Sequence, residues 1–126
     1  MSGINFGNSK KNIFMETKIK NTLTKWFPDA FSSFSGIDDA SDYEVLNYFA
    51  QSTLNLLKQN QIEQCREHLK IINLLYSGGT LHDKNAIENE FLAILVCAEM
   101  PTLLKTHIDM MPKELRAVYL KTILEN

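Results

Sequence analysis

The fold of this chain is decided by the stretch from Ser41 to Ala98, which reads SDYEVLNYFAQSTLNLLKQNQIEQCREHLKIINLLYSGGTLHDKNAIENEFLAILVCA. Apolar residues recur in it at spacings of three and four, the period of one face of an α-helix. Asn60 interrupts this pattern once, and the pair Gly78 and Gly79 interrupts it again. The pattern predicts three consecutive amphipathic helices.

The first two of these helices form the predicted hairpin. Ser41 and Glu44 fit a capping box, in which the serine oxygen accepts a backbone N–H and the glutamate reaches back, so a helix is predicted from residue 42 to about 59. Asn60 can adopt the left-handed conformation that ends a helix, and the next helix is predicted over residues 61–77. Two helices joined by so short a turn pack antiparallel.

The flanking segments are also read as helical. Gly78 and Gly79 are expected to supply a positive φ, and Asp83 is the expected N-cap of a helix over residues 84–99. Pro101 and Pro112 are expected to start two shorter helices, to about residues 109 and 124. A first helix is predicted over residues 12–27, ended by Pro28, with one apolar stripe of Met15, Ile19, Leu23 and Trp26. Residues 29–40 read as a loop with a brief helical turn, and residues 1–11 as a flexible N-terminal arm. We therefore predict an all-α, single-domain bundle of about five to six helices over residues 12–126, built around the antiparallel hairpin.

Composition restricts the function classes. The chain has 126 residues, which suits one domain, and a net charge of -2, which is too small to indicate nucleic-acid binding. Its longest apolar run has eight residues, far fewer than a membrane span needs. The polar N-terminus lacks the apolar segment of a signal peptide, so we expect a cytoplasmic protein with no membrane association. Cys65 and Cys97 fall on predicted apolar helix faces, so no disulfide framework is expected.

No residue set with an evident chemistry appears. His68 follows Cys65 by three residues, but two ligands do not close a metal site and no second pair has a suitable spacing. His82 and His107 are isolated in the sequence, and structural or surface roles are expected for all three histidines. No P-loop, nucleophile elbow or paired Cys-x-x-Cys motif occurs. We expect no cofactor, no metal and no enzymatic activity.

Charge is distributed unevenly. Residues 1–25 hold five lysines and one glutamate, a balance of +4, whereas residues 26–57 hold five acidic residues and no lysine or arginine, a balance of -5. The acidic window suggests a docking surface for a basic partner. The alternative is that these residues only stabilise a helix N-terminus and keep a loop soluble. The predicted partner-binding residues are Asp38, Asp39, Asp42, Glu44, Glu88 and Glu90.

The lysines near the N-terminus have two interpretations. Lys10, Lys11, Lys18, Lys20 and Lys25 could form a nucleic-acid patch. Phosphate and base recognition usually recruits arginine as well, and the chain has only Arg66 and Arg116. A solvated helix face is therefore the prediction for these lysines.

The order of elements resembles a group of short bacterial all-helical domains of unknown function, some of which are similar to immunity proteins of toxin systems. The resemblance rests on the helix pair, the glycine break and the segments Trp26-Phe27-Pro28, Ala86-Ile87-Glu88-Asn89-Glu90-Phe91-Leu92 and Pro112-Lys113-Glu114-Leu115-Arg116. It implies a small binding protein and no catalytic residue.

These observations predict a non-enzymatic protein-binding domain. Its partner is expected to be another protein, with an immunity-type inhibitor of a basic toxin as the specific form. One alternative is a ligand-binding bundle with a pocket lined by Trp26, Tyr48, Tyr76 and Phe91. The other is a structural homo-oligomer, such as a homodimer.

Overall fold

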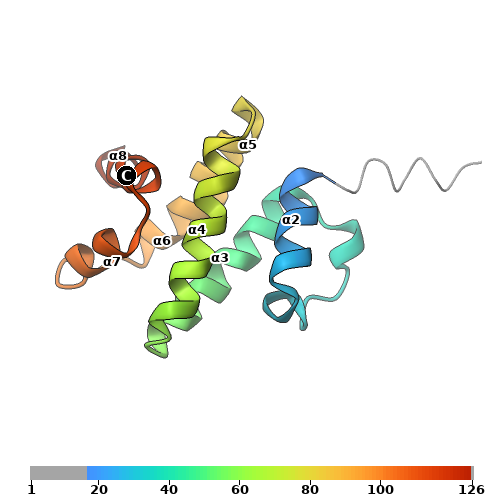
Figure 1. Ribbon diagram of the computed structural model, residues 1–126, viewed down its shortest axis with the longest axis horizontal. Helices are drawn as coiled ribbons and strands as arrows, with labels where there is room; N and C mark the ends of the chain where they lie inside the picture. Colours follow the sequence, from blue (N-terminus) through green and yellow to red (C-terminus); the bar gives the residue numbers. More distant parts are fainter. Residues whose placement is uncertain (1–16, 126) are drawn as a thin grey trace, which may run out of the picture.

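The computed structural model describes residues 17–125, and this part of the chain is a single all-α domain without strands (Figure 1). Its helices are α2 (Lys18–Trp26), α3 (Asp42–Lys58), α4 (Ile62–Ser77), α5 (Leu81–Ile87), α6 (Ala93–Cys97), α7 (Leu104–Met110) and α8 (Lys113–Glu125). Two 3-10 turns, η1 (Pro28–Phe31) and η2 (Ile37–Asp39), follow α2, and a π-helical turn, η3 (Glu88–Leu92), joins α5 to α6. The prediction of an all-α bundle is confirmed. The predicted arm and the start of the predicted first helix lie outside the described residues.

The α3–α4 hairpin is the centre of the domain, as predicted. The Ser41 hydroxyl accepts the Glu44 N–H at 3.2 Å, and the Glu44 carboxylate accepts the Ser41 N–H at 2.9 Å, so the predicted capping box is present. Asn60 has a φ of 58° and ends the helix in the left-handed conformation. In Figure 1, α2 lies on one side of this hairpin and α7 and α8 lie on the other.

Two predictions for α2 are wrong. Trp26 was expected on the buried stripe with Ile19 and Leu23, but it is 69% exposed at the last residue of α2. Lys20 was expected on a solvated face, but it is buried. Its ammonium group donates to the carbonyl oxygens of Asp38 at 2.6 Å and Ala40 at 3.3 Å. Lys20 therefore anchors the loop that follows α2.

The third predicted helix begins earlier than expected. Thr80 is the N-cap, and Asp83 is the third helical residue of a second capping box, at 3.2 Å and 3.1 Å. The helix then continues through η3, where the Ala93 N–H bonds to the Glu88 carbonyl oxygen in a wide π turn. The wider turn accompanies the burial of two consecutive residues, Phe91 and Leu92.

The two glycines before α5 do not supply a positive φ. Gly78 has a φ of -98°, and Gly36 is the single glycine with a positive φ among residues 17–125. Close packing requires a glycine at position 79, because a Cβ atom there would lie 2.5 Å from the Leu75 carbonyl oxygen and 2.8 Å from the Asp83 Cβ. A Cβ atom at Gly78 would meet nothing nearer than 3.4 Å.

Helices α7 and α8 complete the domain on the far side of α4. The predicted helix start at Pro101 is a turn, and α7 begins three residues later, whereas α8 begins directly after Pro112. The Asn73 side chain on α4 accepts the Leu115 N–H at 3.1 Å and so caps the first turn of α8 from another helix. No helix in residues 17–125 is both long and apolar enough to cross a membrane.

The close approach at Gly79 generates a stability prediction. We expect Gly79→Ala to lower the free energy of unfolding by about 1–3 kcal/mol, because the new methyl group would force α4 and α5 apart. Gly78→Ala, one residue away, is the matched control and should change stability by about 0.5 kcal/mol or less. Urea unfolding followed by circular dichroism measures both, and equal effects at the two positions would contradict the packing argument.

Candidate functional site

The six acidic residues predicted to bind a partner have different surroundings. The side chain of Asp42 is only 8% exposed. It accepts a hydrogen bond from the Thr17 hydroxyl, and the imidazole of His82 lies 4.0 Å away. Asp42 therefore joins the starts of α2, α3 and α5, and its carboxylate is occupied within the domain.

Glu88 also makes an internal contact. Its carboxylate accepts a hydrogen bond of 2.5 Å from the Tyr76 hydroxyl on α4. Burial, together with this bond and the carboxylate charge, raises the pKa of Tyr76 to about 12. The pair ties η3 to α4, so the main role of Glu88 in the structure is packing between helices.

Glu44 and Glu90 lie together at one surface depression. This Glu44–Glu90 depression has a volume of about 290 Å³, and its lining residues are Tyr43, Glu44, Asn47, Tyr48, Gln51 and Glu90. Two carboxylates, two amides and two phenol rings face it, and no lysine or arginine does. Glu90 belongs to the π turn η3, and such turns often occur at functional sites. The structure thus brings two of the predicted residues together from α3 and η3.

Asp38 and Asp39 are exposed on the neighbouring loop. The Lys20 ammonium group holds the backbone of this loop through two carbonyl oxygens. The loop also packs on α3, because the Phe34 ring stacks on the Tyr48 ring at 4.5 Å. Tyr48 lines the Glu44–Glu90 depression, so the loop is fixed beside it.

A second concave site was not found from the sequence. This His68 groove has a volume of about 350 Å³ and lies between the end of α2, η1, α3 and α4. Its lining residues are Trp26, Phe27, Pro28, Asp29, Ala30, Ser52, Leu56, Gln64, Glu67 and His68. The sequence signal that it contains is the Trp26-Phe27-Pro28 segment, which places two aromatic rings at a helix end.

His68 is a buried polar residue at the wall of this groove. It is 5% exposed, and its ring stacks on Phe49 at 4.2 Å and meets the edge of Phe27 at 4.7 Å. Its Nδ1 atom lies 2.9 Å from the Thr53 hydroxyl, which also donates to the Phe49 carbonyl oxygen at 2.8 Å. A hydroxyl has one hydrogen to donate and a carbonyl oxygen can only accept, so Nδ1 is the donor to Thr53. The Nε2 atom is therefore an acceptor.

The protonation state of His68 follows from its burial. Burial lowers the pKa of His68 from 6.5 to about 4. The imidazole is therefore neutral at neutral pH, in agreement with the hydrogen-bond assignment. His68 therefore packs in the aromatic core and bonds to Thr53, and the acceptor at Nε2 is an additional feature.

A third polar cluster lies where α6, α7 and α8 meet. The Glu99 carboxylate accepts the Tyr119 hydroxyl at 2.5 Å and the Met100 N–H at 3.2 Å, and His107 Nδ1 lies 2.9 Å from it. Burial and the Glu99 carboxylate raise the pKa of Tyr119. The adjacent cavity, which His107 and Cys65 help to line, has only about 20 Å³, room for about one water molecule. The cluster can hold three helices together, but it has no space for a substrate.

The cysteines and metal ligands offer no further site in residues 17–125. No group of three or more His, Cys, Asp or Glu side chains is arranged to hold a metal ion there. Cys65 is buried, and burial raises the pKa of its thiol to about 11, with a smaller opposing effect of Arg66. Cys97 was expected on an apolar face, but it is exposed because α6 ends at this residue.

The predicted ligand pocket is not assembled. Trp26 is mostly exposed, Tyr48 stacks on Phe34, Tyr76 bonds to Glu88, and Phe91 packs on Phe49 in the core. The four rings therefore do not line one common cavity in the described chain. Of the four, Trp26 alone lines the His68 groove.

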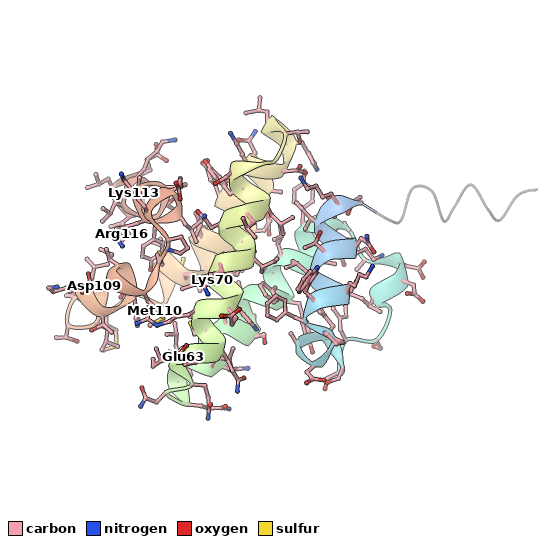
Figure 2. The ribbon with its side chains drawn as sticks, viewed as in Figure 1. Glu63, Lys70, Asp109, Met110, Lys113 and Arg116 are labelled. Carbon is pink, nitrogen blue, oxygen red and sulfur yellow. The ribbon has the colours of Figure 1, made fainter. Side chains whose placement is uncertain are left out.

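Another groove lies between α4 and the end of α7, and its lining residues are Arg66, Lys70, Asn73, Leu74, Asp109, Met110, Met111 and Pro112. Figure 2 shows Lys70 and Glu63 on α4, and Asp109, Met110, Lys113 and Arg116 on α7 and α8. Its charged groups are largely paired along their own helices: Arg66 with Glu63, Lys70 with Glu67, and Lys105 with Asp109. This groove therefore has mixed charge and no preference for one sign of ligand.

Comparison with known proteins identifies a family but no activity. Residues 20–125 match a family model described as Domain of unknown function (DUF7674). The match agrees with the predicted resemblance to helical domains of unknown function. No curated protein and no solved structure is detectably similar to the chain.

The neutral, buried state of His68 predicts a specific pH dependence. The unfolded chain takes up a proton at this residue below about pH 6.5, whereas the folded chain does so only near pH 4. The contribution of His68 to folding stability is therefore complete above about pH 6.5 and is lost as the pH falls towards about 4. Between about pH 7 and about pH 5 the loss should reach up to about 2 kcal/mol. The free energy of urea unfolding is measured as a function of pH for the natural chain and for His68→Phe, which keeps the stacked ring. The difference between the two pH dependences gives the contribution of His68. Identical pH slopes in the two proteins would contradict the assignment.

Proposed function

The chain belongs to the DUF7674 family of domains of unknown function, and we propose that it binds a basic protein through the Glu44–Glu90 depression and the adjacent Asp38–Asp39 loop. The observation that carries this proposal is the composition of the depression. It combines two carboxylates with two tyrosines and two amides, without a neutralising lysine or arginine among its lining residues.

The charge pattern of the chain supports a basic partner. Residues 26–57 contain no lysine or arginine, so the acidic groups of α3 and of the preceding loop have no local cation in sequence. Charged surfaces of one sign accelerate the approach of a partner of the opposite sign. Tyrosine is enriched at protein interfaces because it offers a large apolar ring and a polar tip.

The location of the depression is compatible with tight binding. It lies on α3, whose N-terminus is fixed by a capping box, and beside a loop held by Lys20 and by the Phe34–Tyr48 stack. Side chains on such ordered elements lose little conformational freedom on binding. Asp42 and Glu88 are left out of the proposed contact surface, because their carboxylates bind the hydroxyl groups of Thr17 and Tyr76 and neither residue is exposed. Glu44 is kept, because it is exposed although its carboxylate accepts the Ser41 N–H.

The specific form of this proposal is an immunity-type inhibitor of a basic toxin. A nuclease is a suitable partner class, because a site that holds phosphates is positively charged. An acidic surface that covers such a site would exclude the nucleic acid. The alternative prediction of a structural homo-oligomer is tested by the molar mass of the purified chain in light scattering.

The proposal predicts the effect of charge reversal. The test variant replaces Asp38, Asp39 and Glu90 by lysine and keeps Glu44, because Glu44 belongs to the capping box. The matched control replaces Glu63, Asp109 and Glu125 by lysine, which gives the same change in net charge at exposed positions elsewhere. We expect the test variant to weaken binding of the partner by about tenfold or more, through loss of attraction and new repulsion.

The measurement has two steps. The natural chain captures its partner from a lysate of the native host, and calorimetry then compares the affinity of the purified partner for the three proteins. For an inhibitor, the activity of the partner should also be lost on binding. Equal weakening by the test and control variants would show that net charge alone acts, and undiminished binding by the test variant would exclude the proposed surface.

A further inference from the structure

The His68 groove contains an unused hydrogen-bond acceptor. His68 donates through Nδ1 to Thr53, and its Nε2 atom has no hydrogen-bond partner among residues 17–125. This atom is not sealed in the core, because Arg116 Nε is the one fully buried side-chain nitrogen or oxygen without a partner in that part of the chain. A nine-tenths buried imidazole thus presents its acceptor at the groove wall. A complementary ligand has to bring an N–H or O–H donor.

The charges of the groove select the kind of donor. Asp29 and Glu67 line it, and no lysine or arginine does. Glu67 lies 3.2 Å from Lys70, whereas the Asp29 carboxylate has no hydrogen bond or ion pair within the described chain. Two carboxylates and a neutral acceptor disfavour an anion and favour a cation with N–H donors.

Aromatic rings form the remaining recognition surface. Trp26 and Phe27 line the groove together with the imidazole of His68. Cations bind over the faces of such rings, and tryptophan is the strongest of them. Trp26, Phe27 and Glu67 also line a separate groove, where Lys18 and Lys70 add positive charge. The His68 groove has no lysine or arginine among its lining residues, so it is the better site for a cation.

We propose that the His68 groove binds the guanidinium group of an arginine side chain, presented by the basic partner. This inference rests on the proposed function, because that partner supplies the arginine. The guanidinium group is planar, stacks on aromatic rings and carries several N–H donors, so it can lie on Trp26 while it donates to His68 Nε2 and to Asp29. A lysine ammonium group is compact and strongly hydrated, and it matches a site walled by flat rings less well.

Ligand binding in this groove can be followed by tryptophan fluorescence. Trp26 is the one tryptophan in the sequence, so intrinsic fluorescence reports on its surroundings. The probe is N-acetyl-arginine amide, added to the full chain. We expect a saturable fluorescence change with a dissociation constant on the order of a millimolar, which is ordinary for so small a ligand. N-acetyl-citrulline amide, which has nearly the same shape without the charge, should give no saturable change.

Three variants locate the binding. His68→Phe keeps the ring on Phe49 and the Thr53 bond to the Phe49 carbonyl oxygen, and it removes the Nε2 acceptor together with the Nδ1 bond to Thr53. Asp29→Asn removes the unpaired charge at an exposed position. Each should weaken binding of the probe by about tenfold. Glu63→Gln, on the same helix as Glu67 but outside the groove, is the matched control and should bind as the natural chain does.

The outcomes separate this inference from the proposed function. An absent saturable change, an equal response to the citrulline compound, or stronger binding of N-acetyl-lysine amide would each overturn the guanidinium site. If His68→Phe does not fold, Asp29→Asn alone decides the location. Loss of partner binding on reversal of Asp38, Asp39 and Glu90, with no arginine binding, would refute this inference alone. Arginine binding without any effect of that reversal would refute the proposed surface alone.

Discussion

The domain depends on one buried ring, Phe49. It lies in the middle of α3 and packs on four aromatic rings outside this helix, with centroid distances of 4.2 Å to His68, 5.3 Å to Phe27, 5.9 Å to Phe31 and 6.0 Å to Phe91. The segment that follows α2, the partner helix α4 and the π turn η3 all meet at this ring. The same contact determines the state of His68, because an imidazole that stacks on Phe49 and makes an edge contact with Phe27 is removed from water and stays neutral. One packing constraint therefore creates both the core and the wall of the groove.

The acidic residues divide according to whether a partner exists inside the domain. Asp42, Glu88 and Glu99 bind hydroxyl groups of Thr17, Tyr76 and Tyr119, and each of these bonds links two helices or the segments next to them. A buried carboxylate without such donors would be costly, so these three are structural. Asp29, Asp38 and Asp39 are exposed, and Glu90 lines a surface depression. Asp29, Asp38, Asp39 and Glu90 make no hydrogen bond through their carboxylates within residues 17–125, so these groups are the ones open to a partner, together with the exposed Glu44.

Local rules predict the parts of this fold that depend on neighbouring residues in the sequence. The capping box at Ser41, the left-handed Asn60 and the apolar periodicity of α3 and α4 are of this kind, and all are confirmed. The failures involve contacts between distant residues. Trp26 shares the helical stripe of Leu23 but is largely exposed, and Gly79 is required by the close approach of Asp83. Lys20 is buried where its ammonium group binds carbonyl oxygens of a later loop. Periodicity likewise indicates that His68 lies on a helix, but not that it meets Phe27 and Thr53. The sequence indicated Glu44 and Glu90 as candidate residues, but not that they share one depression. It did not predict the His68 groove.

The two proposed contacts would act on different steps of binding. Asp38, Asp39 and Glu90 contribute at or near the surface, where charge mainly sets the rate of approach and is screened by salt over about 8 Å. The acceptor of His68 lies at the wall of a groove between aromatic rings, where solvent is partly excluded and hydrogen bonds to a cation are stronger. Contacts of this second kind mainly slow dissociation. Each proposed contact includes acidic residues from the stretch of residues 26–57 that has no lysine or arginine, because this stretch contains Asp29 as well as the acidic loop. Helix capping alone does not account for this acidic window, because only part of it caps a helix, whereas Asp29 lines the His68 groove and Asp38 and Asp39 lie on the loop beside the Glu44–Glu90 depression.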